Sequence, residues 1–178
     1  MIVETPRLRL RPWREEDKPA FRALVNTPAM MAYFGGVRPD AEIDALLDAQ
    51  MALQARDGYS MGAVELRDGT LAGICGVRHQ TSYSDLAVNG ELEIGWRIGE
   101  DYWGQGIARE AAQASIDWGF ANTDFARIAA WTCIENVRSW GLMERLGMTR
   151  RPELDFRHPG PAPDDPHGAM IVYTIDRA

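Results

Sequence analysis

Hydrophobic and polar residues alternate along residues 91–98, which is the period of a β-strand. Four apolar side chains share one side of this strand: Leu92, Ile94, Trp96 and Ile98. From Ile107 to Trp118 the apolar residues recur every three to four positions instead, which is typical of a helix. Two closely spaced glycines, Gly104 and Gly106, separate the two patterns. The sequence therefore predicts a strand, a glycine turn and a helix at the centre of the chain.

The residues before this centre predict strands and helices on a simple plan. Residues 2–10 alternate arginine with leucine and predict one strand. Acidic residues at 15–17 precede an apolar periodic stretch, as at a helix N-terminus. Asp40 is expected to cap a second helix. Residues 59–66 and 71–78, joined by an Asp-Gly turn, predict a hairpin, and a polar loop leads from it to the central strand.

The residues after the central helix complete the sheet. Residues 127–134 predict a strand, 136–146 a helix, and 148–151 a further strand. Residues 152–168 hold five prolines and are expected to be irregular, and residues 169–175 are expected to close the sheet. The predicted fold is a mixed α/β arrangement of the α+β type, with a mostly antiparallel sheet and helices on both faces. One domain over residues 1–178 is expected, because the length suits one core and no linker interrupts it.

The glycine turn has a chemical use. The first turn of a helix exposes backbone N–H groups and the positive end of the helix dipole, which together attract phosphate. A nucleoside triphosphatase loop is excluded, because Ile107 follows Gly106 where lysine is required and the only lysine is Lys18. A dinucleotide site is disfavoured, because Arg109 stands where a third glycine belongs. A pyrophosphate held by amides alone, as in coenzyme A, and a plain connection both stay open.

Two motifs carry a resemblance to a known family. The segment W-G-Q-G-I-A-R-E-A at 103–111 is followed by E-N-V-R-S at 135–139 and L-M-E-R-L-G-M at 142–148. With the opening E-T-P-R-L-R-L-R-P-W at 4–13, the chain resembles the GNAT superfamily of N-acetyltransferases, and most closely its RimJ/RimL-like branch. The likeness spans nearly the whole chain. Two departures are Trp103, where the general pattern has Gln or Arg, and Met143, where many members have a catalytic tyrosine.

The resemblance implies where acetyl-CoA would bind. In that fold the central strand and the strand at 127–134 splay apart, and the pantetheine arm pairs with the free backbone groups. We assign this pairing to Trp96, Arg97 and Ile98, with one N–H polarising the thioester carbonyl. The pyrophosphate is assigned to the turn and the first helical residues: Trp103, Gly104, Gln105, Gly106, Ile107, Ala108 and Arg109.

Two residues are candidates for the general base that an amine acceptor needs, because an ammonium cannot attack. Glu93 is the first, on the polar side of the central strand, although an ion pair with a nearby arginine explains it equally well. His158 is the second because the pKa of histidine suits proton transfer, and a surface loop histidine is its plainer interpretation.

The start of the helix at 136–146 supplies two more candidates. Asn136 suits a pantetheine amide and also suits a helix N-cap, and both roles are compatible. Ser139 lies one turn on, where it would bond the leaving thiolate or donate a proton through water; a solvated serine is the alternative. Because Met143 cannot act as an acid, Ser139 is the candidate that remains there.

Composition adds limits. The net charge of −7 opposes generic nucleic-acid binding. No apolar run is long enough to span a membrane, and the arginine-rich start does not match a signal peptide, so a cytoplasmic protein is expected. Cys75 and Cys133 predict buried free thiols, and no Cys/His spacing predicts a metal site.

The predicted function is an N-acetyltransferase of the EC 2.3.1 type that moves an acetyl group directly from acetyl-CoA to an amine, either a protein N-terminus or a small molecule. The apolar patch at 26–39 either packs in the core or lies near the acceptor. A non-catalytic acyl-CoA sensor and a nucleotide-binding protein are the alternatives. A homodimer through an exposed sheet edge also stays open.

Overall fold

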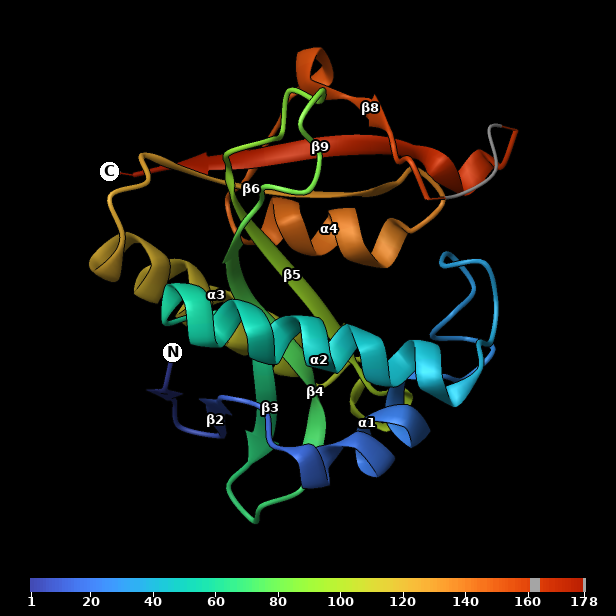
Figure 1. Ribbon diagram of the computed structural model, residues 1–178. Helices are drawn as coiled ribbons and strands as arrows, with labels where there is room; N and C mark the ends of the chain where they lie inside the picture. The colour runs from blue at the N-terminus through green and yellow to red at the C-terminus, as the bar shows by residue number, and fades with distance from the viewer. Residues whose placement is uncertain (161–163, 178) are drawn as a thin grey trace.

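The computed structural model describes residues 1–160 and 164–177, and a nine-stranded sheet lies at its centre (Figure 1). Neighbouring strands follow the order β1-β2-β3-β4-β5-β6-β9-β7, and β8 pairs with β9. The strands are β1 Val3–Glu4, β2 Leu8–Arg11, β3 Gly62–Leu66, β4 Leu71–His79, β5 Leu92–Ile98, β6 Arg127–Cys133, β7 Thr149–Arg150, β8 Phe156–Arg157 and β9 Ala169–Asp176.

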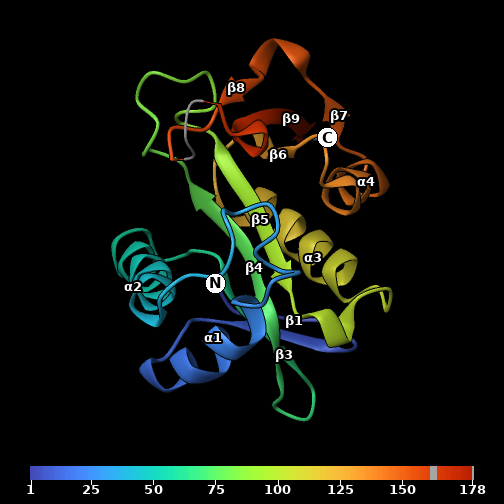
Figure 2. The same ribbon diagram turned by 90° about the vertical axis from the view of Figure 1, so that its right-hand side faces the viewer.

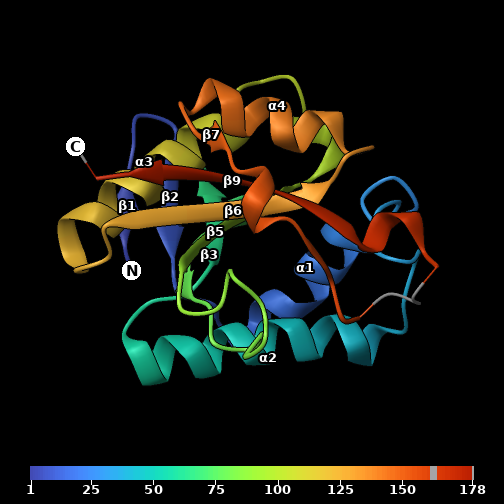
Figure 3. The same ribbon diagram turned by 90° about the horizontal axis from the view of Figure 1, so that it is seen from above.

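Helices cover both faces of the sheet, as Figure 3 shows. One layer holds α1 Lys18–Val25 and α2 Asp40–Asp57, and the other holds α3 Ile107–Asn122 and α4 Val137–Arg145. Each layer has its own apolar core: Phe21, Ile43 and Leu47 pack on the α1/α2 side, and the alanines and isoleucines of α3 pack on the other. The predicted mixed, mostly antiparallel sheet with helices on both faces is confirmed.

One pair of strands differs from all the others in the described sheet. β5 and β6 are parallel, whereas every other pair is antiparallel. A parallel connection needs a crossover, which α3 provides. The β5–β6 ladder holds only two residue pairs, Leu92 with Ile128 and Glu93 with Ala129. Figure 2 shows β5 running beside β4 through the middle of the molecule, while β6 lies next to β9 at the top of the view.

The prediction of one strand over residues 2–10 is wrong. The structure has a hairpin there, in which β1 and β2 pair antiparallel with Val3 opposite Leu10. Residues 5–7 make the turn, closed by the Thr5 N–H donating to the Leu8 carbonyl at 2.9 Å. Pro6 lacks an N–H and fixes its own φ, so it favours the turn and interrupts the alternation.

Two smaller expectations are also wrong. Asp40 does not cap α2: it is the first helical residue, Pro39 holds the N-cap position, and no side-chain cap bond forms. The Asp40 carboxylate instead lies 3.5 Å from Arg22 Nε on α1. Residues 152–168 are not wholly irregular. They contain β8, which lies between Pro152 and Pro159 in the sequence and pairs with β9. Two single turns of 3-10 helix flank it, at Pro152–Leu154 and Pro166–Gly168, and residues 161–163 lie outside the described part.

Candidate active site

The site begins where β5 and β6 separate. After Glu93 and Ala129 the two strands no longer pair, although β6 keeps its full ladder with β9 as far as Cys133. We call residues 94–98 of β5 and 130–133 of β6 the β5–β6 divergence. The predicted splaying of these strands is therefore confirmed, and it leaves backbone groups of β5 without a strand partner on that side.

The register decides which groups those are. The Gln80 N–H donates to the Glu91 carbonyl and the Gly99 N–H to the Ala72 carbonyl, both at 2.9 Å, so odd-numbered residues of this stretch bond β4. By alternation, the backbone groups of Trp96 and Ile98 point toward the divergence, and those of Arg97 point toward Ile74. The backbone role predicted for residues 96–98 therefore fits Trp96 and Ile98, and does not fit Arg97.

Trp103 closes one end of the divergence. Its indole Nε1 donates to the Ile98 carbonyl at 2.7 Å, so that carbonyl already has a partner. The Arg138 guanidinium, from the first turn of α4, lies 4.4 Å from the centre of the Trp103 ring. This stacking joins α4 to the glycine turn across the two strands. Trp103 thus holds the turn against β5, a role that no periodicity in the sequence indicated.

The glycine turn has the conformation that its sequence suggested. Gly104 and Gly106 have φ values of 74° and 77°, a region that other residues rarely adopt. Gly106 is the N-cap of α3, and no side chain caps that helix. Ile107 is buried and anchors the first turn, while Gln105 and Arg109 are exposed. The first amides of a sixteen-residue helix therefore lie at the surface beside a turn without side chains.

Arg7 supports this turn and was missed by the sequence analysis. Its Nη1 donates to the Gln105 carbonyl at 2.8 Å and its Nε to Glu110 Oε2 at 2.5 Å. The Thr5 hydroxyl donates to the same carboxylate at 2.6 Å. Burial raises the pKa of Glu110, but the bonds from Thr5 and Arg7 outweigh it and lower the pKa overall. Arg7 lies about one hundred positions earlier in the chain, so no local pattern could reveal the contact.

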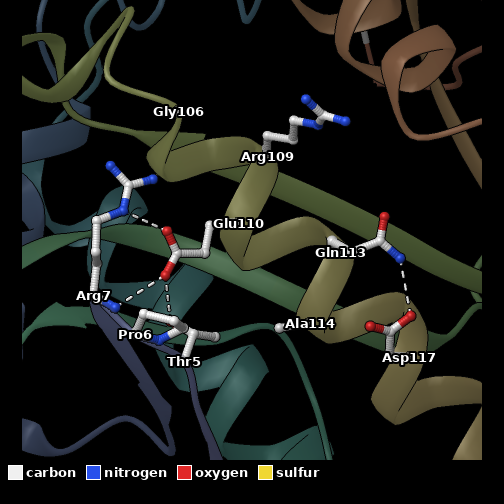
Figure 4. A pocket seen from close by; sticks show the side chains of 9 residues that line it. All are labelled: Thr5, Pro6, Arg7, Gly106, Arg109, Glu110, Gln113, Ala114 and Asp117. Atoms are coloured by element: carbon white, nitrogen blue, oxygen red, sulfur yellow. Dashed lines mark hydrogen bonds and ion pairs between the residues drawn. The ribbon is translucent and has the colours of Figure 1, made fainter.

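A shallow hollow of about 510 Å³ lies between the β1–β2 turn and the outer side of α3. Figure 4 shows Arg7 and Glu110 paired on one wall and the Arg109 side chain directed away from them. The hollow is lined by Thr5, Pro6, Arg7, Gly106, Arg109, Glu110, Gln113, Ala114 and Asp117. It reaches the predicted phosphate site only at Gly106 and Arg109, on the side of α3 away from β5.

The structure confirms that Asn136 caps the N-terminus of α4. Asn136 is the N-cap: its Oδ1 accepts from the Ser139 N–H at 3.3 Å, and its Nδ2 donates to Thr132 Oγ1 at 3.1 Å. One amide hydrogen of Asn136 remains available. The Ser139 hydroxyl makes no hydrogen bond within the described residues. Met143 is 1% exposed and packs in the core with Leu142 and Leu146.

Glu93 is almost fully buried, 8% exposed, and sits in an ion pair. Its Oε2 accepts from Arg78 Nε and from Gln80 Nε2, both at 2.8 Å. The ion pair that the sequence left open is therefore present. Both bonds reach the same oxygen, so Oε1 keeps its lone pairs free of hydrogen bonds from the described residues. A carboxylate held this way stays in a fixed position while one oxygen can accept a proton.

His158 belongs to an aromatic cluster and is not a simple surface residue. Its ring lies 5.3 Å from Tyr83, which also contacts Trp131 and Phe156 at 6.3 and 6.0 Å. The Gly160 N–H donates to His158 Nδ1 at 3.0 Å, so the neutral ring carries its proton on Nε2 and donates it to the Tyr83 oxygen at 2.6 Å. Burial, then the nearby Arg78 charge, lowers the pKa of His158.

Tyr83 is a second residue that the sequence did not single out. Because its oxygen accepts from His158, its own hydroxyl proton is free to donate elsewhere. Burial and the Glu93 charge raise the pKa of Tyr83, and the weaker opposing influence of Arg78 does not reverse this. The phenol therefore stays protonated near neutral pH. It lies in the loop at 80–91, where only a polar composition was visible in the sequence.

Arg97 projects from the same side of β5 as Glu93. Its guanidinium carbon lies 3.9 Å from the centre of the Phe34 ring, in the loop at 26–39. Burial lowers the pKa of Arg97 to about 10, and the charges of Arg38 and Arg78 act in the same direction. The apolar patch at 26–39 thus divides: Met30 and Met31 pack in the core, whereas Phe34 is exposed beside Arg97.

Comparison with known proteins identifies the family. The model of the acetyltransferase (GNAT) domain family matches residues 7–149. The chain belongs to the GNAT acetyltransferase family. The uncharacterised protein YkkB of Bacillus subtilis is 30% identical over 146 residues, which cover 81% of this chain and 83% of YkkB. This GNAT chain is therefore an acetyl-CoA-dependent acyltransferase of class EC 2.3.1.

Solved structures agree on the fold. An acetyltransferase from Agrobacterium tumefaciens has a TM-score of 0.79 at 26% identity, covering 99% of this chain and 95% of its own. RimL, an alpha-N-acetyltransferase of ribosomal protein L7/L12 solved with coenzyme A, has a TM-score of 0.77 at 19% identity, covering 99% and 98%. At this identity, the neighbour shows that the two proteins share a fold.

Other features bear on the chemistry. Cys75 and Cys133 are buried free thiols, as predicted, and burial raises the pKa of Cys75 to about 12. Within residues 1–160 and 164–177, no three His, Cys, Asp or Glu side chains are grouped to hold a metal ion. Across those same ranges, no helix has the length and apolar character needed to cross a membrane.

Proposed function

We propose that this GNAT chain transfers an acetyl group directly from acetyl-CoA to a primary amine, on a protein N-terminus or on a small molecule. One observation carries the proposal: the β5–β6 divergence starts directly after Glu93, and the glycine turn that leads into α3 follows its other end, where Trp103 bonds the Ile98 carbonyl. Backbone donors for an extended arm, amides for a pyrophosphate and a fixed carboxylate thus follow one another along β5.

The binding roles follow from this order. The carbonyl of Trp96 and the N–H of Ile98 would pair with the pantetheine arm as a further strand does. The amides after Gly104 and Gly106 would hold the pyrophosphate, with Arg109 adding a charge-assisted bond. Both glycines have open space or a flexible arginine tip where a Cβ would sit, so the turn fits a closely approaching phosphate. Acetyl-CoA supplies the thioester that these groups position.

The chemical roles are assigned to groups on either side of the divergence. Glu93 Oε1 would accept a proton from the acceptor's ammonium group, directly or through a water, and the neutral amine would then attack the thioester carbonyl carbon. The Trp96 N–H would stabilise the oxyanion, which is worth about 3 kcal/mol for one fixed amide. The leaving thiolate would take a proton from Ser139 or Tyr83, whose hydroxyls are free to donate. The N–C bond would form from the amine lone pair, and the electron pair of the broken C–S bond would leave with sulfur. The proton then released by the amide nitrogen would return through water to the hydroxyl that protonated the thiolate.

A substitution of Glu93 tests this function. Glu93→Gln keeps the size of the side chain but removes the base, so acetyl transfer should fall by about 10²- to 10⁴-fold while acetyl-CoA binding is kept. The matched control is Glu91→Gln, two positions earlier and just before β5, where the carboxylate is ion-paired with Arg127 beside the paired end of the β5–β6 ladder. Loss of activity in both variants, or in neither, would contradict a catalytic role for Glu93.

The alternative from the sequence, a non-catalytic sensor of acyl-CoA, conflicts with membership of an acyltransferase family, and Met143 is the residue that supports it. Met143 stands where many members of the resembled family have a catalytic tyrosine, and it is packed in the core. A sensor predicts acetyl-CoA binding, seen as a rise in the thermal unfolding midpoint, without turnover of any amine. The acceptor class, a single domain over residues 1–178 and a homodimer remain predictions, because a likeness to RimL at 19% identity supports the fold only.

A further inference from the structure

Arg97 is an arginine whose charge the described protein does not balance. No carboxylate lies within ion-pair distance of it, and its guanidinium makes no hydrogen bond within residues 1–160 and 164–177. Arg11, also near the α1/α2 layer, has two carboxylates, those of Asp17 and Glu65. Arg97 is half-buried, and a half-buried cation without a counter-charge is less favourable than one in water, so its position calls for a physical explanation.

The contact with Phe34 leaves the binding edge of Arg97 available. The aromatic ring covers one flat face of the guanidinium at 3.9 Å. The N–H groups of a guanidinium point outward in its plane, in the fork that matches a carboxylate. Phe34 is itself held in place, because Arg38 Nη2 donates to its carbonyl at 2.7 Å. Arg97 is therefore pre-oriented by stacking, while its fork is unused by the described protein.

The surrounding charges are of the same sign. Arg38 and Arg78 both lower the pKa of Arg97, after burial, and it remains a cation at neutral pH with a pKa of about 10. The Arg78 charge is already matched by Glu93. Arg38 reaches Glu42 at 3.9 Å, on the outside. An anion placed at Arg97 would thus meet an unmatched positive potential.

The register places Arg97 on the same face of the sheet as Glu93, the proposed base. Arg97 lies opposite Ile74, which packs in the core with α1 and α2, and Glu93 lies opposite Arg78 on the same side. The glycine turn and α3 lie on the other face. Glu93 and Arg97 are four residues apart, which is about 13 Å along a strand. One acceptor molecule can therefore offer an amine near Glu93 and a second group to Arg97.

We propose that Arg97 binds a carboxylate of the amine acceptor, so that the enzyme prefers acceptors that carry both an amine and a carboxylate. The proposal rests on the proposed acetyl transfer and names the substrate class of the same site. Two sources offer this chemistry: a small aminocarboxylic acid, or a peptide with an acidic side chain close to its N-terminus.

Matched acceptors test the proposal. Acetylation at saturating acetyl-CoA is compared for 6-aminohexanoate against its amide, and for Ser-Glu-Ala-amide against Ser-Gln-Ala-amide. The carboxylate form in at least one pair should have a kcat/KM about tenfold or more above its neutral form, since charge-assisted hydrogen bonds are strong. Which pair shows the preference identifies the source of the carboxylate.

Variants tie the preference to Arg97. Arg97→Met should abolish the ratio within the pair while leaving the KM for acetyl-CoA unchanged, and Arg97→Lys should keep part of it. Arg56→Met is the control, because Arg56 lies exposed on the last turn of α2 and pairs with Asp57. The ratio should be the same in Arg56→Met as in the unmodified enzyme.

The outcomes separate this proposal from the proposed function. Equal use of charged and neutral acceptors, or a preference that survives Arg97→Met, would overturn the role of Arg97 while acetyl transfer stands. Absence of any acetyl-CoA binding would overturn the proposed function. For acceptors that bind without turnover, thermal unfolding in the presence of CoA gives the same comparison, and an equal shift for both members of each pair would also refute it.

Discussion

Arg11 and Arg97 lie on the same side of the sheet, yet their charges are balanced in opposite ways. Arg11 donates to both oxygens of Asp17 at 2.7 and 2.9 Å and to Glu65 at 2.5 Å, and these contacts, led by the Asp17 hydrogen bond, raise its pKa. Arg97 instead contacts the aromatic ring of Phe34 and has two cationic neighbours, Arg38 and Arg78, and its pKa is lowered. The fold supplies counter-charges where an arginine serves stability, and the difference indicates that Arg97 serves a ligand.

The largest effect should come from breaking the network of Arg11. Arg11→Met removes one partner and leaves Asp17 and Glu65 without their cation, which should cost about 3–5 kcal/mol of unfolding free energy. Urea unfolding measures this. A loss below about 1 kcal/mol would mean that Arg11 is no more structural than Arg97, and the comparison would fail.

The next-largest effect on stability should come from replacing either of two glycines, one in the candidate site and one outside it. Gly58 and Gly106 both have positive φ, at 81° and 77°, so Gly58→Val and Gly106→Val should each cost about 1–3 kcal/mol. Gly58 ends α2 and Gly106 begins α3. Only Gly106→Val should also lose acetyl-CoA binding, as measured by isothermal titration on the folded fraction. Equal binding by both variants would remove the glycine turn from the site.

A smaller effect should depend on pH. The folded-state pKa of His158 is lowered, so the folded protein prefers the neutral ring. Stability should be complete above pH 6.5, the ordinary histidine value, and should decline as the pH falls from there through the lowered pKa. Because the ring is only half-buried, the decline should stay below about 1 kcal/mol. Comparing urea midpoints of the unmodified protein and His158→Gln between pH 5 and 8 checks this, and identical curves would contradict it.

The smallest effect should be that of Arg97→Met on stability. Replacing an unpaired, half-buried cation with an apolar side chain should be neutral or stabilising, by at most about 1 kcal/mol. The sign should thus be opposite to that of Arg11→Met under the same urea conditions. A clear destabilisation would show that the stacking on Phe34 is structural.

Much of the fold could be predicted from the sequence because it depends on local periods. The change from a two-residue to a 3.6-residue period fixed β5 and α3, and the Asn136 cap marked the start of α4. The β1–β2 hairpin was missed because one proline weighed less than the alternation around it. The strand β8 was missed because five prolines outweighed two residues that pair with β9.

The same distinction between local patterns and distant contacts applies to the residues of the candidate site. Glu93, Gly106 and Asn136 were visible because each belongs to a local motif. The support of the turn by Arg7, the proton of Tyr83 and the isolation of Arg97 depend on residues 60 to 100 positions away in the chain or on the absence of a partner. No window of the sequence contains that information. The assignment of backbone pairing to Arg97 failed for a related reason, because only the β4 register shows which way each peptide group points.

The short ladder between β5 and β6 also bears on how force and motion pass through the molecule. Strands β1 to β5 and strands β6 to β9 are two ladders joined through two residue pairs, the helix α3 and the packing around it. A ligand that adds hydrogen bonds along the divergence would tie the two halves together. The amide hydrogens of β6 near Trp131 and Cys133 should then exchange with solvent more slowly in the ligand-bound enzyme. Slow relative motion of the two halves would be suppressed during turnover.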